Sequence, residues 1–170
     1  MKIFLLLICM GVTAANVFAQ TDTSAVVQDT LAPYQKTPYI PSFSILTPDS
    51  TWFRRVDLEE KKPTLILYFS PDCGHCQTET EEIISKMKDL KNLQIVMITS
   101  RPYADMINFS NHYKIDRFRP IKIGTDPARM VTRFYDVRFT PFSALYDKNG
   151  KLIKVYKSGI DLPELVNLVK

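Results

Sequence analysis

The chain has 170 residues, of which 45% are hydrophobic and 24% charged, and its formal net charge is +4 at pH 7. This composition is that of an ordinary globular domain, and the chain contains no repeats or low-complexity tracts. The densest basic stretch, residues 117–119, is short and is better explained as a solvated loop than as a nucleic-acid site, so we expect no nucleic-acid partner.

The N-terminus predicts a signal peptide over residues 1–19. Lys2 gives a basic start, residues 3–12 form an apolar run, and Ala19 is the small residue that signal peptidase prefers. We therefore expect cleavage before Gln20 and export to the periplasm. The alternative is an uncleaved membrane anchor, which the polar Asn16 disfavours.

A flexible leader is expected over residues 20–40, which are polar and contain two prolines. The folded domain is expected over residues 41–170. It begins with two short stretches of alternating polarity, 43–46 and 51–56, separated by a Thr-Pro-Asp-Ser turn. This pattern predicts a β-hairpin ahead of the main sheet.

The next stretch carries the chemistry. An apolar strand over residues 64–69 stops at a Ser-Pro-Asp turn, and a pattern with helical spacing begins at Cys73. Unpaired N–H groups and the positive end of the dipole at a helix N-terminus favour a thiolate, and the pKa of such a cysteine falls from about 8.5 to roughly 3.5–7.5. Cys76, one turn later, should stay protonated. This asymmetry is what reversible thiol–disulfide exchange requires.

The number of cysteines supports a chemical role for this pair. Cys9 leaves with the signal peptide, so the mature chain keeps only Cys73 and Cys76. A disulfide between residues so close in sequence contributes little to stability through chain entropy. We therefore expect Cys73–Cys76 to be a redox-active disulfide.

The remaining elements alternate between helices and strands. In chain order we expect a helix over 74–89, a strand over 93–99, a helix over 103–114 and a strand over 121–124. Asp126 and Pro127 then open a helix whose inward-facing residues are Met130, Val131, Phe134 and Tyr135. Strands over 142–146 and 152–156 are joined by an Asn-Gly turn, and a C-terminal helix is capped by Asp161 and Glu164. This order predicts an α/β fold with a central mixed β-sheet flanked by helices on both faces.

Two motifs resemble those of the thioredoxin superfamily: Cys-Gly-His-Cys at 73–76 after a buried strand, and Phe-Thr-Pro-Phe at 139–142 before a hairpin. The N-terminal hairpin and the additional helix and strand over 103–124 are similar to those of exported bacterial thiol–disulfide oxidoreductases of the TlpA and ResA type. The resemblance covers roughly residues 41–170. It implies a thioredoxin-like fold with an N-terminal β-hairpin, and disulfide exchange with protein substrates without a cofactor or metal.

The resemblance also implies roles for single residues. Pro141 matches the cis-proline that faces the dithiol, at a cost of only about 1 kcal/mol for an X-Pro bond, and Thr140 would offer its backbone to a bound substrate strand. Glu79 matches an acid that accepts the proton of Cys76, although a solvated helix glutamate is an equal alternative. His75 can stabilise the Cys73 thiolate, which makes the disulfide more oxidising.

The chain departs from the family pattern at three positions, one of which is Glu81, where no proline interrupts the helix. Leu67 stands in place of a buried aspartate, so proton transfer would fall to Glu79 or water. Asp72 stands in place of a tryptophan, and its negative charge would raise the pKa of the neighbouring thiol. Because His75 favours the Cys73 thiolate and Asp72 disfavours it, the sequence does not determine the reduction potential.

Three further points remain expectations. The sequence does not determine the direction of electron flow, although reduction of substrates is favoured. The resemblance implies an upstream membrane electron donor or acceptor. We also expect the protein to be a monomer. One alternative function is a peroxiredoxin-like thiol peroxidase, because Ser70 and Cys73 have the spacing of the Thr-x-x-Cys motif. Another is a non-catalytic binding module, but zinc needs about four ligands and only His75 and His112 could add nitrogen donors.

Overall fold

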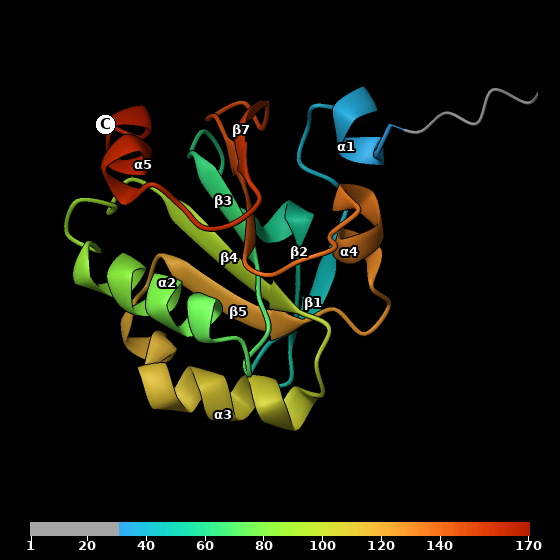
Figure 1. Cartoon of the computed structure of the whole chain (residues 1–170), viewed down its shortest axis with the longest axis vertical. Coiled ribbons are helices and arrows are strands. Elements are labelled where there is room, and N and C mark those ends of the chain that lie inside the picture. The colour runs from blue at the N-terminus through green and yellow to red at the C-terminus, as the bar shows by residue number, and fades with distance from the viewer. Residues whose placement is uncertain (1–30) are drawn as a thin grey trace, which may run out of the picture. The chain divides into compact units, whose positions relative to one another are not determined.

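Residues 31–170, which the computed structural model describes, fold around one seven-stranded sheet (Figure 1). The predicted signal peptide and most of the predicted leader lie outside these residues. The elements are α1 (Pro33–Lys36), β1 (Ser44–Leu46), β2 (Trp52–Arg54), a 3-10 helix (Arg55–Asp57), β3 (Thr64–Tyr68), α2 (Gly74–Ser85), β4 (Gln94–Thr99), α3 (Tyr103–Tyr113), a second 3-10 helix (Ile115–Arg117), β5 (Ile121–Thr125), α4 (Met130–Tyr135), β6 (Phe142–Tyr146), β7 (Leu152–Tyr156) and α5 (Leu162–Leu168). Between residues 31 and 170, no helix has both the length and the apolar character needed to cross a bilayer.

The sheet is mixed, as the sequence predicts. Its strand order is β2-β1-β5-β4-β3-β6-β7, in which β3, β4 and β5 run parallel and all other neighbours are antiparallel. The predicted N-terminal hairpin is β1–β2, and it joins the sheet through the pairing of Leu46 with Thr125. A Cβ atom at Gly124 would lie 2.8 Å from the Leu46 carbonyl oxygen, so the glycine permits this close approach.

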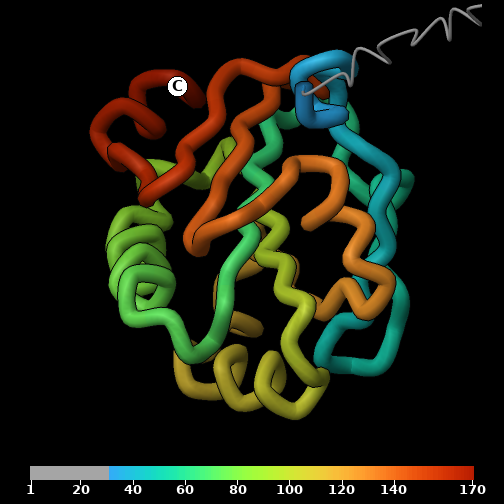
Figure 2. The backbone as a smooth tube through the Cα atoms, turned by 45° about the vertical axis from the view of Figure 1, so that its right-hand side comes forward, coloured from blue at the N-terminus to red at the C-terminus, as the bar shows by residue number. Residues whose placement is uncertain are grey.

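Strand β3, which lies between β4 and β6, is buried on both faces. Leu65 and Leu67 belong to a core shared with α2, α3 and α5, whereas Ile66 and Tyr68 belong to a second core shared with α1 and α4. Figure 2 shows α2 and α4 on opposite sides of the strands. Successive strand residues point to opposite faces, so both sides of the sheet need a cover of helices.

The leader prediction for residues 20–40 is wrong for its last part, because residues 33–40 pack onto the domain. Tyr34 is 8% exposed, and its ring centroid lies 5.9 Å from that of Tyr135 and 6.3 Å from that of Phe142. The Leu152 N–H donates to the Pro38 carbonyl oxygen at 2.7 Å. Aromatic burial and this strand pairing fix a segment that polar composition and prolines predicted as flexible.

The end of α2 and the start of α4 differ from the prediction. α2 ends at Ser85 instead of residue 89, because the Lys86 N–H is shared among three carbonyls and the backbone then continues in tight turns. α4 begins at Met130 rather than at residue 127, because Arg129 adopts a left-handed conformation with φ 53°. The N-cap residue is therefore Arg129 and not Asp126, although Asp126 Oδ2 accepts from the Val131 N–H at 2.8 Å. The side chain of Met130 is exposed rather than inward.

The C-terminal elements agree more closely with the prediction. The β6–β7 turn contains Gly150 at φ 74°, and Asp147 Oδ1 accepts from the backbone N–H groups of Asn149 and Lys151. Asp161 caps α5, because its Oδ1 accepts from the Glu164 N–H at 3.0 Å.

Candidate active site

Both cysteines lie at the start of α2, directly after strand β3. Cys73 is the N-cap residue, and its carbonyl oxygen accepts the first helical hydrogen bond from the Gln77 N–H at 3.1 Å. The Ser70 carbonyl in turn accepts from the Cys73 N–H at 3.1 Å, which fixes the loop that leaves β3. Both residues are free thiols in this structure, Cys73 partly exposed and Cys76 buried. The predicted disulfide is therefore described in its dithiol state.

The two thiols have opposite pKa shifts. Partial burial raises the pKa of Cys73, but hydrogen bonds from the thiol and backbone of Cys76, from the Thr140 side chain and from the His75 backbone outweigh it, so the pKa lies below its ordinary value. Burial raises the pKa of Cys76 to about 12. At neutral pH Cys73 is the better nucleophile and Cys76 keeps its proton.

The loop before β6 faces Cys73. The Thr140 carbonyl oxygen lies 3.5 Å from Cys73 Sγ and accepts a hydrogen bond from the thiol. The peptide bond between Thr140 and Pro141 is cis, as the family resemblance implies. The structure thus brings together two motifs that lie 67 residues apart in the sequence.

Glu79 is buried one helical turn after Cys76, with 5% of its surface exposed. Its Oε1 accepts from the Ile160 N–H at 2.7 Å, and its Oε2 is buried without a hydrogen-bond partner among the described residues. Burial raises the pKa of this carboxyl to about 7, although the Ile160 hydrogen bond opposes the shift and Glu82 adds to it. Of the two alternatives for Glu79, the solvated glutamate is therefore excluded.

Asp72 and His75 lie on the exposed side of the site. The Ser70 hydroxyl donates to Asp72, and Arg101 Nη2 lies 3.3 Å from Asp72 Oδ2. Arg101 follows β4, and no sequence motif linked it to the cysteines. It offsets the negative charge that we expected to act on Cys73. The His75 side chain is exposed, and its backbone forms one of the hydrogen bonds that lower the pKa of Cys73.

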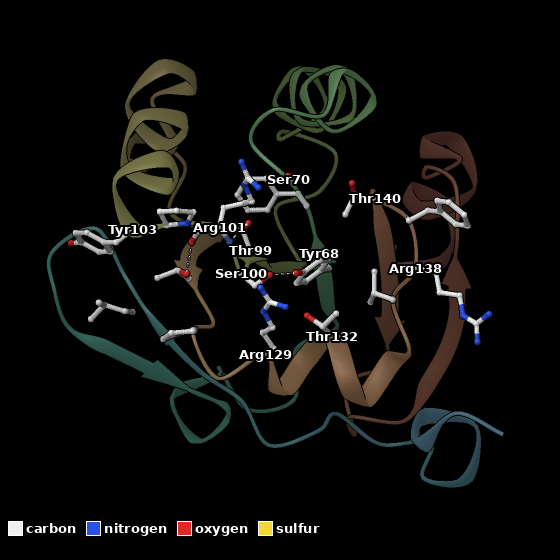
Figure 3. A pocket seen from close by; sticks show the side chains of 17 residues that line it. Tyr68, Ser70, Thr99, Ser100, Arg101, Tyr103, Arg129, Thr132, Arg138 and Thr140 are labelled. Carbon is white, nitrogen blue, oxygen red and sulfur yellow. Dashed lines mark hydrogen bonds between the residues drawn. The ribbon is translucent and has the colours of Figure 1, made fainter. Parts of the chain in front are cut away.

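A pocket of about 960 Å³ opens beside Thr140 at the ends of β3 and β4 (Figure 3). The residues between 31 and 170 that line it include three arginines, Arg101, Arg129 and Arg138, and no acidic residue. None of the three was predicted as a site residue, because they come from separate loops and share no motif. Between residues 31 and 170, no three His, Cys, Asp or Glu side chains are grouped so that they could hold a metal ion.

The comparisons with known proteins agree with this geometry. The model of the AhpC/TSA family matches residues 38–163. The protein disulfide-isomerase erp38 of Neurospora crassa is 27% identical over 117 residues, which cover 69% of this chain but only 26% of that protein. The chain thus spans about a quarter of the length of this relative.

Solved structures show the same fold. A protein from Neisseria meningitidis described as a thioredoxin has a TM-score of 0.63 and 25% identity, over 76% of this chain and 85% of its own. A secreted disulfide oxidoreductase of Mycobacterium tuberculosis, homologous to Escherichia coli DsbE, has a TM-score of 0.62 and 19% identity, over 75% of this chain and 93% of its own. The expected thioredoxin-like fold is confirmed, and since the family match covers most of the sequence, the chain belongs to the AhpC/TSA family.

Proposed function

We propose that this protein is a thiol–disulfide oxidoreductase that exchanges disulfides with protein substrates through Cys73 and Cys76. The observation that carries the proposal is the difference between two thiols one turn apart: the accessible one has a lowered pKa, and burial raises the pKa of the other to about 12. The similarity to proteins named as a disulfide-isomerase and a disulfide oxidoreductase supports the same chemistry.

The exchange takes two steps. The Cys73 thiolate attacks one sulfur of the substrate disulfide, so a mixed disulfide forms and the other substrate sulfur leaves as a thiolate that takes a proton from water. Cys76 then attacks Cys73 Sγ and releases the first substrate sulfur. The substrate gains two electrons and two protons, and the protein is left with a Cys73–Cys76 disulfide.

Glu79 is the proposed proton acceptor in the second step. Cys76 must lose its proton to attack, and a thiol with a pKa of about 12 does not do so unaided at neutral pH. A carboxyl with a pKa of about 7, one turn along the same helix, can take that proton. Its free Oε2 is the atom available to receive it.

The loop around Thr140 is the proposed place for the substrate. A polypeptide strand that pairs with the Thr140 backbone beside Pro141 would bring its disulfide to Cys73, because Thr140 already contacts Cys73 Sγ. The exposed imidazole of His75 can add positive charge near the thiolate when protonated, which favours the dithiol form.

The cellular setting is proposed on the sequence. An N-terminal signal peptide, cleaved before Gln20, would export the protein to the periplasm as a monomer, where an upstream membrane partner would supply or remove electrons. The favoured direction is reduction of substrates. That one structural neighbour is described as secreted supports export.

The test is reduction of insulin disulfides with the protein kept reduced by dithiothreitol. We expect turnover by the wild type and none by Cys73→Ser. Cys76→Ser should accumulate a covalent adduct with the substrate, because the first step proceeds and the second cannot. Wild-type activity in the Cys73→Ser variant would refute the proposal.

A thiol peroxidase remains the alternative. Its expected signature was a hydroxyl three residues before the reactive cysteine, but the Ser70 hydroxyl donates to Asp72, and Ser70 bonds Cys73 only through its backbone. Steady consumption of hydrogen peroxide with a thiol donor, at rates well above insulin reduction, would favour the peroxidase.

A further inference from the structure

The pocket beside Thr140 is basic in a way that the thiol chemistry does not require. Arg101, Arg129 and Arg138 line it from three different segments, after β4, before α4 and after α4, although the guanidinium of Arg138 is turned away from the pocket (Figure 3). Among the described residues that line it, no Asp or Glu balances their charge. The pocket shares Thr140 with the cysteine site, so a ligand in it would lie next to Cys73.

Neighbouring acids compensate two of the three arginines. Arg101 pairs with Asp72 at 3.3 Å, and Arg138 Nη2 lies 3.0 Å from Asp136 Oδ2. Among residues 31–170, Arg129 has no acidic partner, and its guanidinium points into the pocket toward Ser100 (Figure 3). The uncompensated positive charge of the pocket therefore belongs to Arg129.

Hydroxyl groups surround the same space. Tyr68 and Ser100 share a hydrogen bond of 2.6 Å between their hydroxyl oxygens. The Thr132 hydroxyl, one turn into α4, is buried without a hydrogen-bond partner in the described part of the chain. Buried polar atoms are nearly always paired, so a hydroxyl that lines a pocket unpaired is a donor available to a ligand.

We propose that this pocket binds a carboxylate side chain of the substrate polypeptide, close to the disulfide that Cys73 attacks. Arg129 would bind the carboxylate, because a guanidinium and a carboxylate form two parallel hydrogen bonds, and Thr132 would donate a further one. This inference rests on the proposed function and adds a substrate preference to it: disulfides flanked by acidic residues react faster.

The test compares two peptides that differ in one side chain. Both have blocked termini and one cysteine held as a mixed disulfide with 2-thiopyridine, and one carries Glu where the other carries Gln a few residues from that cysteine. Cys73 attacks the peptide sulfur and expels pyridine-2-thione, whose absorbance gives the second-order rate constant. Cys76 then frees the peptide thiol, so one dithiol is oxidised for each peptide disulfide reduced.

We expect the wild type to react with the Glu peptide about five- to tenfold faster than with the Gln peptide, the size of an ordinary net hydrogen bond, because Arg129 is exposed and solvent screens its charge. Arg129→Gln and Thr132→Val should each lower this ratio, Arg129→Gln to nearly one. Arg133→Gln is the matched control, because it removes the same charge from an exposed position on α4 outside the pocket, and it should keep the ratio.

The outcomes separate the two proposals. If both peptides react equally fast with the wild type, the acidic preference is wrong and the oxidoreductase remains. If the ratio survives in both Arg129→Gln and Thr132→Val, this pocket does not bind the carboxylate, and the oxidoreductase again remains. If neither peptide reacts, the proposed function itself fails. Because Thr132→Val nearly preserves the side-chain volume, it decides the case should Arg129→Gln fail to fold.

Discussion

At the scale of single residues, the site depends on unequal burial along one face of α2. Cys73 sits at the helix start with partial exposure, and Cys76 and Glu79 follow it into the core. Burial penalises charge on both, so Cys76 stays a thiol and Glu79 holds a proton up to about pH 7. One helix thus presents an accessible thiol of lowered pKa, a buried protonated thiol and a buried carboxyl in succession.

Replacement of Glu79 by glutamine should change how stability depends on pH. The pKa of Glu79 is raised from 4.5 to about 7, so between these values the folded protein keeps a proton that the unfolded chain has released, and the free energy of unfolding falls as pH rises. Above pH 7 the buried carboxylate costs about 3 kcal/mol, since one pKa unit equals about 1.4 kcal/mol. Glu79→Gln should therefore be more stable than wild type by about 2–3 kcal/mol at pH 8.5 and nearly equal at pH 4.

Urea denaturation at several pH values measures this difference. Glu81→Gln is the control, because Glu81 is exposed on the same helix, and its effect should stay within about 0.5 kcal/mol. A constant difference between Glu79→Gln and wild type from pH 4 to 8.5 would show that Glu79 ionises normally. If Glu79 accepts the Cys76 proton, the same variant should also accumulate mixed disulfide during turnover.

The sequence predicted the site only as far as local patterns reach. Cys73 and Cys76 were found because a strand, a turn and a helix follow each other within a few residues. The burial of Glu79 could not be predicted, because the covering Ile160 comes from 81 residues further on. Arg129 was missed for the same reason, since only the fold brings it to Thr140.

At the scale of elements, tertiary packing accounts for the differences from prediction. The four-residue helix α1 is too short to be stable alone, and its sequence has no periodicity to reveal it. It forms because Tyr34 packs on α4 and β6. In contrast, β3 and β4 were predicted nearly to the residue, because strands buried on both faces appear as continuous apolar runs.

Removal of the Tyr34 ring tests whether α1 belongs to the domain. Tyr34→Ala should lower the free energy of unfolding by about 2–3 kcal/mol, somewhat less than for a fully buried aromatic residue, because the ring lies at the edge of the core. Tyr39→Ala is the matched control: Tyr39 is 50% exposed, and its loss should cost about 0.5 kcal/mol or less. Equal small losses in the two variants, measured by urea denaturation, would mean that residues 33–36 add nothing to the fold.

At the scale of the whole molecule, the sheet carries the site by its connectivity. The parallel strands β3 and β4 have their C-terminal ends on the same side of the sheet, where they lead into the Cys73 loop and Arg101. The antiparallel strand β6 begins on that side, directly after the Thr140 loop. The Cys73 thiol, the Thr140 backbone and the arginine-lined pocket therefore meet although they are distant in sequence. Helices cover the sheet on both faces, through one core that includes α2, α3 and α5 and another that includes α1 and α4.

This arrangement links global stability to the redox state. In the dithiol form the folded protein lowers the pKa of Cys73, so the thiolate adds stability at pH values above that folded pKa, and this stability is lost as pH falls through it. The disulfide form has no such titration, while Glu79 titrates in both forms. The free energy of unfolding of the reduced protein, minus that of the oxidised protein, should therefore rise with pH until the unfolded Cys73 also ionises near pH 9.

Parallel urea titrations of the two forms measure this difference, and the Glu79→Gln variant should give the same slope. A difference that stays flat from pH 5 to 9 would mean that the fold leaves Cys73 an ordinary thiol, and the nucleophile of the proposed mechanism would be lost with it.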